Sequence, residues 1–161
     1  MTSPAERLAE LGLSLPGVAA PLAAYVPAVR VGDLVFTSGQ LPTVEGRLTA
    51  IGKVGAEVTA DTAAECAGVA ALNGLAAVAA EVGGLDAIVR VVKVVVFVAS
   101  APDFTAQAQV ANGASHLLGD IFGRHGQHAR SAVGMAVLPL DAPVEVELVV
   151  EVRPTPTIRT V

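Results

Sequence analysis

One segment near the end of the chain alternates so regularly that it restricts the fold more than any other feature. From Val144 to Val152 every second residue is Val or Leu, and the residues between them are three glutamates and one valine. Successive side chains of a β-strand point to opposite faces of a sheet. The pattern therefore predicts a strand with one face in a hydrophobic core and a second face that carries carboxylates.

Other apolar runs predict the remaining strands. Ile88–Val98 is rich in valine in both alternating sets of positions, which is typical of a central strand that is largely buried on both faces. Ala28–Val31 and Leu34–Thr37 flank a Gly-Asp pair and predict a hairpin. Arg130–Val137 predicts a further strand, and the glycine-punctuated stretch Leu41–Glu57 is expected to be a loop with a short strand.

Two longer helices are expected between these strands. Thr59–Val82 is dominated by alanine, Thr62 and Glu65 have the spacing of a capping box, and Gly83 follows as a stop signal. A second helix is expected over Asp103–Phe122. Because each helix is separated from the next by a strand, both are expected to pack on the same sheet.

The predicted order of elements gives an α+β fold, in which two helices lie on one face of a mixed sheet. Nothing within the chain is left to cover the other, still valine-rich face. The composition points the same way, because hydrophobic residues make up 53% of the chain and charged residues only 16%, against about 25% in typical soluble domains. We therefore expect the chain to associate with copies of itself.

The length of 161 residues suits one folded domain. We expect a lead-in over residues 1–24, with a short helix at Pro4–Leu11, then a domain over residues 25–153 and a tail over residues 154–161. The N-terminal segment lacks the basic and apolar regions of a signal peptide, and no apolar run reaches the roughly 18 residues of a membrane-spanning helix. A cytoplasmic protein is the expectation.

The sequence also disfavours several kinds of chemistry. Cys66 is the only cysteine, which excludes an intramolecular disulfide, and three scattered histidines argue against a zinc site. The net charge of −5 argues against nucleic-acid binding. No phosphate-binding loop, dinucleotide-binding glycine motif or metalloprotease motif occurs, so no metal or organic cofactor is expected and function must rest on individual residues.

Arg130 and Glu145 are the first candidates for functional residues. Arg130 begins an otherwise apolar run, and a guanidinium entering a buried strand needs an anionic partner, either a ligand or an internal glutamate, unless it reaches solvent. Glu145 begins the polar face of the last strand, which a plain solvated edge also explains. If that strand paired with Arg130–Val137 through the intervening turn, the two side chains would lie close together.

Tyr25, Ser38 and Gly39 are weaker candidates. Tyr25 is the only tyrosine and precedes the first predicted strand, where a tyrosine is more often a packed ring with a satisfied hydroxyl. Ser38 and Gly39 end the second strand of the hairpin. A small residue and a glycine let a ligand approach the backbone, although an ordinary turn accounts for them as well.

Four blocks of this sequence together resemble the RidA/YjgF reactive-intermediate deaminase family. They occur in the family's order and cover roughly residues 25–152. The blocks are Arg30–Pro42 (RVGDLVFTSGQLP), Val92–Val98 with Asp103-Phe104, His128–Val133 (HARSAV), and Leu138-Pro139 with Val144–Glu147. The resemblance implies a chorismate-mutase-like fold that assembles as a homotrimer with three clefts between subunits.

The resemblance also implies an activity, the hydrolysis of short-lived enamines and imines such as 2-aminoacrylate to a 2-keto acid and ammonia. Arg130 matches the family arginine that holds the substrate carboxylate, and Glu145 matches the glutamate associated with positioning the attacking water. Tyr25, Ser38, Gly39 and Asn112 match positions that line the pocket. The reaction needs no metal and no organic cofactor, and the implied partners are two further copies of the chain and a small carboxylate.

The sequence departs from the family pattern at the pocket. Ala132 stands two residues after the arginine, where many members have Cys or Thr, and the helix around Asn112 lacks the expected aromatic pattern. An alternative hypothesis is therefore a non-catalytic protein that binds small carboxylates or regulates a partner. A third, ribonuclease activity, is disfavoured by the acidic chain with one Tyr and no Trp.

Overall fold

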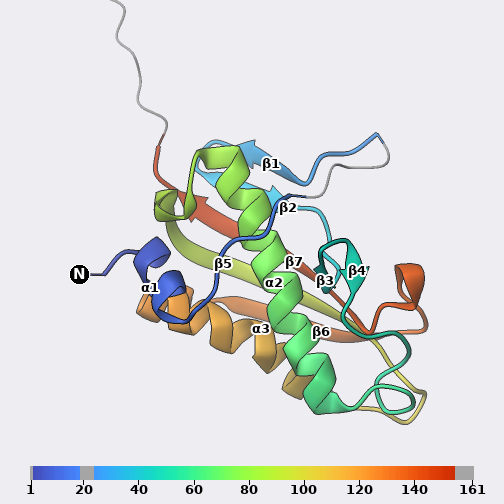
Figure 1. The fold of residues 1–161 in the computed structure, drawn as a ribbon. Coiled ribbons are helices and arrows are strands. Elements are labelled where there is room, and N and C mark those ends of the chain that lie inside the picture. Colours follow the sequence, from blue (N-terminus) through green and yellow to red (C-terminus); the bar gives the residue numbers. More distant parts are fainter. Residues whose placement is uncertain (1, 19–23, 155–161) are drawn as a thin grey trace, which may run out of the picture.

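The computed structural model describes residues 2–18 and 24–154. Five strands form the main sheet in the order β1-β2-β7-β5-β6. Their bounds are Ala28–Val31 for β1, Leu34–Thr37 for β2, Ile88–Ala99 for β5, Ala129–Met135 for β6 and Val144–Val152 for β7. Only β5 and β6 pair in parallel, and all other neighbours are antiparallel, so the sheet is mixed as expected (Figure 1).

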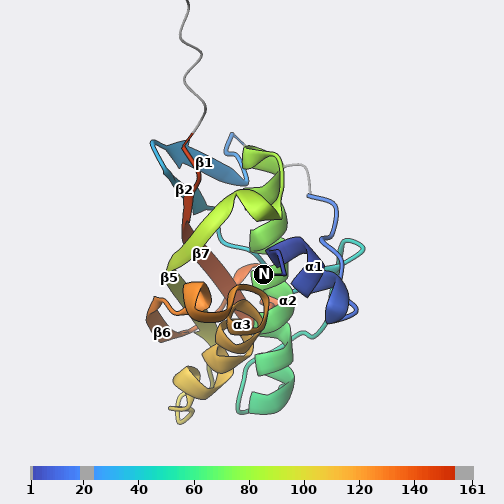
Figure 2. The same ribbon diagram turned by 90° about the vertical axis from the view of Figure 1, so that its left-hand side faces the viewer.

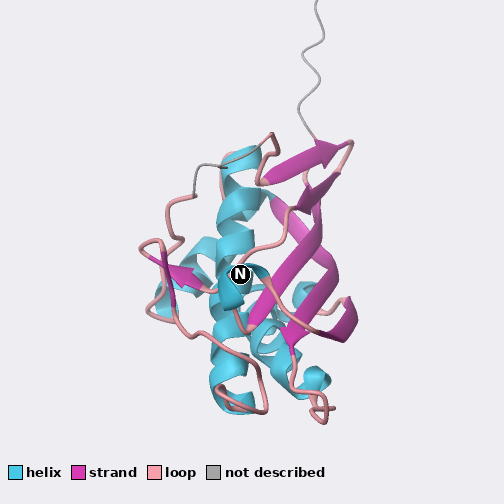
Figure 3. Cartoon of the chain, turned by 90° about the vertical axis from the view of Figure 1, so that its right-hand side faces the viewer, coloured by secondary structure: helices cyan, strands magenta, loops and turns pink. Residues whose placement is uncertain are grey.

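Three α-helices complete the fold, and they lie on one face of the sheet (Figures 2 and 3). They are α1 at Pro4–Glu10, α2 at Ala60–Val82 and α3 at Gln107–Phe122. Helix α2 crosses the sheet over β7 and packs along α3, and α1 packs against α3. We call the side of the sheet beneath α2 and α3 the helix face and the opposite side the open face.

The core lies between the helix face and the helices. The strand β7 shows the predicted alternation, because Val144, Val146, Leu148, Val150 and Val152 are all buried. Gly74 of α2 lies directly above Leu148, and a Cβ atom at that glycine would come within 2.9 Å of the leucine Cδ1. Small residues in α2 therefore let the helix approach the sheet closely.

The predicted helix over Thr59–Val82 is confirmed, but its cap differs from the prediction. Thr59 is the N-cap, and its side chain accepts a hydrogen bond from the backbone N–H of Thr62. Thr62 thus lies inside the helix and forms no capping box with Glu65, because the upstream threonine already occupies the extended cap position. Gly83 ends the helix in a left-handed conformation with φ 84°, as predicted.

By length and composition alone, α2 is apolar enough to cross a bilayer, but 61% of its most hydrophobic window is buried inside the chain. It is the core helix of this fold. Helix α3 begins at Gln107 rather than at Asp103. Phe104 packs into the core beside Gly55, and this packing keeps the residues before Gln107 out of the helix. At the start of the helix the Gln107 side chain donates a hydrogen bond to the Phe104 carbonyl, 2.8 Å away.

The expected pairing of the last two strands is wrong. Strand β5 lies between β6 and β7 and pairs with both of them. The chain leaves β6 parallel to β5, passes through a short turn of 3-10 helix at Pro139–Asp141, and enters β7 on the far side of β5. Left-handed backbone at Leu140 and Asp141, with φ 59° for both, provides the reversal.

The segment between the hairpin and α2 contains two short strands rather than one. These are β3 at Thr43–Val44 and β4 at Arg47–Leu48, which form a separate two-stranded sheet. The Asn73 side chain on α2 donates hydrogen bonds to the carbonyl groups of Leu41 and Thr43. A polar side chain of α2 therefore holds this hairpin against the helix layer.

The open face keeps much of its apolar surface exposed. The cross-strand pair Val29 and Phe36 lies there, with 49% and 44% of these residues exposed. Phe36 in turn pairs with Val149 of β7. No helix within the described ranges covers these side chains, as the sequence analysis predicted (Figure 2).

Candidate functional site

Arg130 lies on the edge strand β6 and points toward α3. Its Cα pairs with that of Val94, whose buried side chain belongs to the helix face. Its Nη1 donates hydrogen bonds to the Asn112 side-chain oxygen at 2.8 Å and to the Ser115 hydroxyl at 3.0 Å. Its Nη2 donates to the carbonyl of Ala108 at 3.3 Å. One side of α3 therefore holds the guanidinium in place.

All three acceptors around Arg130 are neutral. Within residues 2–18 and 24–154, ion pairs join Arg7 to Glu10 and Arg30 to Asp33, and none includes Arg130. An internal glutamate partner, one of the alternatives for this arginine, is thus not found in that part of the chain. A guanidinium has five N–H donors, so Nε–H and one Nη2–H remain without a protein acceptor among the described residues.

Two further side chains join this cluster. The hydroxyl of Ser115 lies 3.0 Å from Nε2 of His128, and Nδ1 of His128 is hydrogen-bonded to the Gly126 carbonyl. Ser115, His128 and Arg130 line an open pocket of about 350 Å³ together with two glycines and Gln127. We call Asn112, Ser115, His128 and Arg130 the arginine cluster.

Glu145 lies on β7 and points to the open face. Its neighbours on either side in the strand, Val144 and Val146, are fully buried on the helix face. Its carboxylate packs against Gly39, where a Cβ atom would fall 1.7 Å from Oε1, so a larger residue at that position would displace the carboxylate. Burial raises the pKa of Glu145 above its ordinary value of 4.5, and the nearby charge of Glu147 raises it further.

Gly39 lies against Glu145, Ser38 precedes it in the chain, and Tyr25 is next to Val26, which Ser38 contacts. Ser38 and Gly39 directly follow β2, and the Ser38 hydroxyl donates to the Val26 carbonyl at 2.7 Å, which holds it beside the segment that carries Tyr25. Tyr25 is 56% exposed, so its ring is not packed in a core within this chain. We call Tyr25, Ser38, Gly39 and Glu145 the glutamate cluster.

The two clusters do not meet within one chain. Arg130 is level with Val94 on β5 and points to the helix face, whereas Glu145 is level with Phe97 and points to the open face. Two steps between neighbouring strands separate them by roughly 10 Å across the sheet, and the offset from Val94 to Phe97 adds roughly 10 Å along the strands. A small molecule bound to Arg130 is therefore out of reach of Glu145 of the same chain.

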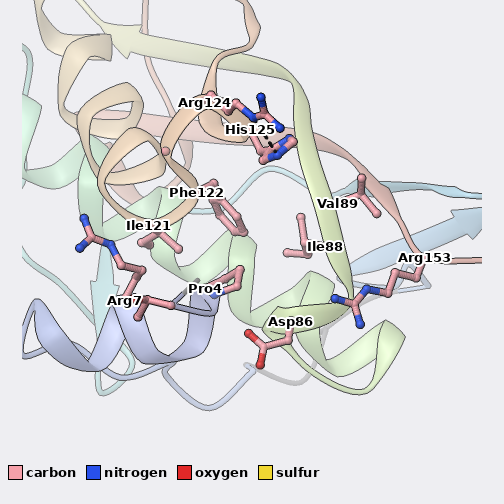
Figure 4. Close-up of a pocket in the computed structure, with 12 residues that line it drawn as sticks. Pro4, Arg7, Asp86, Ile88, Val89, Ile121, Phe122, Arg124, His125 and Arg153 are labelled. Carbon is pink, nitrogen blue, oxygen red and sulfur yellow. Dashed lines mark hydrogen bonds between the residues drawn. The ribbon is translucent and has the colours of Figure 1, made fainter.

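A larger hollow of about 780 Å³ lies elsewhere, between α1, the end of α3 and the start of β5 (Figure 4). Phe122, Ile121 and Ile88 line its middle, and Arg124, which donates to His125 Nε2 at 3.3 Å, lies at its rim. None of the candidates named in the sequence analysis lines it. Size alone therefore does not make it the functional site.

Metal ligands do not gather in the part of the chain that the structure describes. No group of three or more His, Cys, Asp or Glu side chains that could hold an ion occurs among these residues. The one cysteine, Cys66, is buried, and burial raises the pKa of its thiol, which disfavours the reactive thiolate. The available chemistry is that of a guanidinium, two carboxylates, an imidazole and hydroxyl groups.

Comparison with known proteins places this chain in a family. The sequence model of the family described as "YjgF/chorismate_mutase-like, putative endoribonuclease" matches residues 5–152. The chain belongs to the YjgF/RidA family, and its mixed α+β fold is the chorismate-mutase-like fold of that family. The resemblance seen in the sequence is confirmed.

Three relatives illustrate the range of similarity. Protein TCP17 of Trypanosoma cruzi is 45% identical over 152 residues, which are 92% of this chain and 94% of that protein. The protein Atu1372 of Agrobacterium tumefaciens is 44% identical with a TM-score of 0.87, covering 93% of this chain and 92% of that one. Escherichia coli TdcF with bound serine is 28% identical with a TM-score of 0.54, covering 86% and 92%.

Sequence reasoning did not identify Ser115 and His128 as functional candidates. The signals were present, because Ser115 is one helical turn after Asn112 and His128 is two residues before Arg130 in extended backbone. Asn112 and Ser115 therefore lie on the same side of α3, and His128 and Arg130 lie on the same side of the extended chain at β6. What the sequence did not show is that α3 and β6 bring these two sides together.

Proposed function

We propose that this protein hydrolyses small enamines and imines that carry a carboxylate, of the 2-aminoacrylate type, to a 2-keto acid and ammonia. The observation that carries the proposal is the environment of Arg130. Neutral acceptors hold its guanidinium, and two of its donors lack a partner among the described residues. An oriented cation with donors to spare is suited to bind a small carboxylate.

The arginine cluster would bind and orient the substrate. Two parallel charge-assisted hydrogen bonds fix the direction of a carboxylate as well as its affinity, and fixing the reacting group removes much of the entropic barrier. The bound serine of the related TdcF is itself a small molecule with a carboxylate, which agrees with this class of ligand. The imine carbon is electrophilic once its nitrogen is protonated, so no cofactor is needed.

The glutamate cluster would supply the water. A carboxylate within hydrogen-bonding distance can accept a proton from water as the oxygen attacks the imine carbon. The raised pKa of Glu145 suits this role, because burial brings a carboxyl group closer to neutrality and makes it a better base once ionised. Because Gly39 has no side chain, the Glu145 carboxylate can lie against the backbone at the end of β2.

The two clusters lie on opposite faces of the sheet within one chain. The proposed site therefore lies between two chains and takes one cluster from each. In a cyclic homotrimer the arginine cluster of one copy faces the glutamate cluster of the next, and each of three clefts is complete. The exposed apolar side chains of the open face support such an assembly. We infer that the trimer acts in the cytoplasm, where enzymes that use amino acids release such intermediates.

The direct test is release of pyruvate and ammonia from 2-aminoacrylate that a serine dehydratase generates in the same cuvette. Wild type should accelerate the release over the spontaneous reaction, and Arg130→Gln should lower kcat/KM about 30-fold or more, since hydrogen bonds to a charged group are lost. Arg124→Gln is the matched control, because it removes an exposed arginine from the other hollow. Equal rates for wild type and Arg130→Gln would refute the proposal.

A second candidate is a protein of the same fold that binds small carboxylates without turnover. Ala132 supports it, because no side-chain hydroxyl or thiol stands at that position beside Arg130. Calorimetry with pyruvate separates the two, since tight binding without product release indicates the binder. Incubation with RNA tests the third hypothesis, ribonuclease activity. If wild type and Arg130→Gln cleave RNA at the same rate, that activity lies elsewhere on the chain.

A further inference from the structure

The guanidinium of Arg130 is held along one side and free along the other. Nη1 has two acceptors, the Asn112 side-chain oxygen and the Ser115 hydroxyl, and Nη2 donates to the Ala108 carbonyl. The donors without a protein acceptor among the described residues are Nε–H and one Nη2–H. Nε and Nη2 share one edge of the planar group, which we call the free edge, and Nη1 lies on the opposite side. A carboxylate at the free edge can accept two parallel hydrogen bonds.

Ser115 must act as an acceptor toward Arg130, and His128 fixes it in that role. Nη1 of Arg130 can only donate, so a lone pair of the Ser115 oxygen faces it at 3.0 Å. The Gly126 carbonyl can only accept, so Nδ1 of His128 carries a proton, and in the neutral ring Nε2 is an acceptor. The Ser115 hydroxyl donates to this Nε2 across 3.0 Å. The serine proton is therefore directed away from Arg130, and a chain of hydrogen bonds runs from the Gly126 carbonyl to the guanidinium.

Ser115 adds a constraint that Asn112 alone does not provide. A single acceptor on Nη1 leaves the guanidinium plane free to turn about the line between the two atoms, whereas two acceptors on the same nitrogen fix the plane. The contact with the Ala108 carbonyl is longer, at 3.3 Å, than the two contacts at Nη1, which measure 2.8 and 3.0 Å. An arginine side chain that is ordered before the ligand arrives does not lose its rotamer freedom on binding. The pair Ser115 and His128 therefore favours carboxylate binding without contact to the carboxylate.

Neither side chain is placed to touch a ligand on the free edge. Ser115 contacts Nη1, on the far side of the guanidinium, and the two ring nitrogens of His128 bond to Ser115 and to Gly126. The hydroxyl proton of Ser115 is likewise used within the chain. Any effect of these two residues on a bound acid must pass through Arg130.

We propose that Ser115 and His128 are positioning residues that present the free edge of Arg130 to the carboxylate of the substrate. The inference rests on the proposed function and deepens it, because it names the edge that binds and the ligand class that fits. That class is free acids, whose two carboxylate oxygens accept in parallel. An ester of the same acid has no negative charge and cannot form this pair of bonds.

The first measurement uses the full-length protein, isotope-labelled for NMR and kept at mildly acidic pH, where the Nε–H proton exchanges slowly with water. The Nε–H signal of Arg130 is identified as the one that Arg130→Gln lacks. Addition of pyruvate should move this signal downfield, since Nε–H gains a charged acceptor, and methyl pyruvate, the ester, should leave it in place. A signal that stays in place while calorimetry shows pyruvate binding would overturn the proposal.

Variants then test the two positioning residues by calorimetry with pyruvate. Ser115→Ala should weaken binding about 10-fold, the effect of losing one oriented hydrogen bond. His128→Asn keeps a donor for the Gly126 carbonyl but loses the Nε2 acceptor, and should weaken binding about 3-fold, because the serine proton is no longer directed away from Arg130. The double variant should bind as Ser115→Ala does, because His128 acts only through Ser115. His116→Asn, at an exposed position next to Ser115 in sequence, is the matched control and should bind as wild type.

Turnover gives a second measure of the same variants. Each single change should raise KM by about the factor found in calorimetry and change kcat by less than about 3-fold, since the carboxylate is held alike in the ground state and the transition state. Melting curves verify that each variant folds.

The outcomes separate the positioning role from the proposed function. Wild-type pyruvate affinity in both single variants, together with a loss in Arg130→Gln, overturns the positioning role and leaves the hydrolase. Independent effects that add in the double variant overturn the chain of hydrogen bonds, and a loss of kcat at constant KM overturns it as well. The predicted affinities without any turnover support the positioning role and overturn the hydrolase. Absence of pyruvate binding by wild type overturns both.

Discussion

The two faces of the main sheet differ in how the chain covers them. On the helix face, Leu148 and the valines around it are buried beneath α2 and α3. On the open face, Val29 and Phe36 are about half exposed, and the carboxylates of β7 point to the same side. The helix face therefore holds the monomer together, and the open face is available for association.

The functional side chains divide along the same line. The arginine cluster lies on the helix face at the edge strand β6, where α3 holds the guanidinium. The glutamate cluster lies on the open face at the end of β2 and the start of β7. Under the proposed function, a second copy of the chain brings the carboxylate to the cation and completes the site.

The largest effect that tests this contrast is expected in the core. Leu148→Ala should lower the free energy of unfolding by about 3 kcal/mol, since it removes a fully buried side chain beneath α2 and leaves a cavity. Val149→Ala changes the next residue, which points to the open face. Its effect should depend on protein concentration, because it acts through association.

Urea unfolding at several protein concentrations measures both variants. If Leu148→Ala and Val149→Ala lose equal amounts of stability at every concentration, the two faces do not differ in the way described.

The next effect concerns the open face alone. Phe36→Glu should weaken association by roughly 2 kcal/mol per interface, about 30-fold in the association constant, because a half-exposed aromatic ring is replaced by a charge near the carboxylates of β7. Leu11→Glu is the control, since Leu11 is 42% exposed but lies outside the sheet.

Size-exclusion chromatography with light scattering gives the mass of each variant. Wild type and Leu11→Glu should elute as trimers, and Phe36→Glu should dissociate on dilution. A monomeric wild type at micromolar concentration would contradict the proposed assembly.

A smaller effect is expected from Glu145. Because its pKa is raised in the folded chain, the protonated carboxyl favours folding, and that stability is present below the ordinary pKa of 4.5 and lost as pH rises through the folded pKa. Glu145→Gln remains uncharged, so its stability relative to wild type should increase as the pH rises over this range. Urea unfolding at a series of pH values measures this, and two parallel stability curves would show that burial does not disfavour the charged carboxylate.

The sequence predicted the elements well because their signals are local. The alternation of Val144–Val152 and the alanine-rich stretch ending at Gly83 each depend on residues within one element. The start of α3 was misplaced because Phe104 packs against Gly55, a contact distant in sequence.

The candidate site was harder to predict because its geometry depends on strand order. The insertion of β5 between β6 and β7 separates Arg130 from Glu145, and no local pattern reveals it. The contact between Ser115 on α3 and His128 before β6 has the same origin. The pattern of the sequence supplied Arg130 and Glu145 as candidates, and resemblance to a family assigned their roles. Their placement on opposite faces of the sheet required the three-dimensional structure.

A crystal structure of the protein with bound pyruvate tests the central claim most directly. We expect the carboxylate of pyruvate within hydrogen-bonding distance of Nε and Nη2 of Arg130, and a Glu145 carboxylate from a neighbouring copy beside the keto carbon. Pyruvate bound away from Arg130, or a cleft to which no second copy contributes a residue, would contradict it.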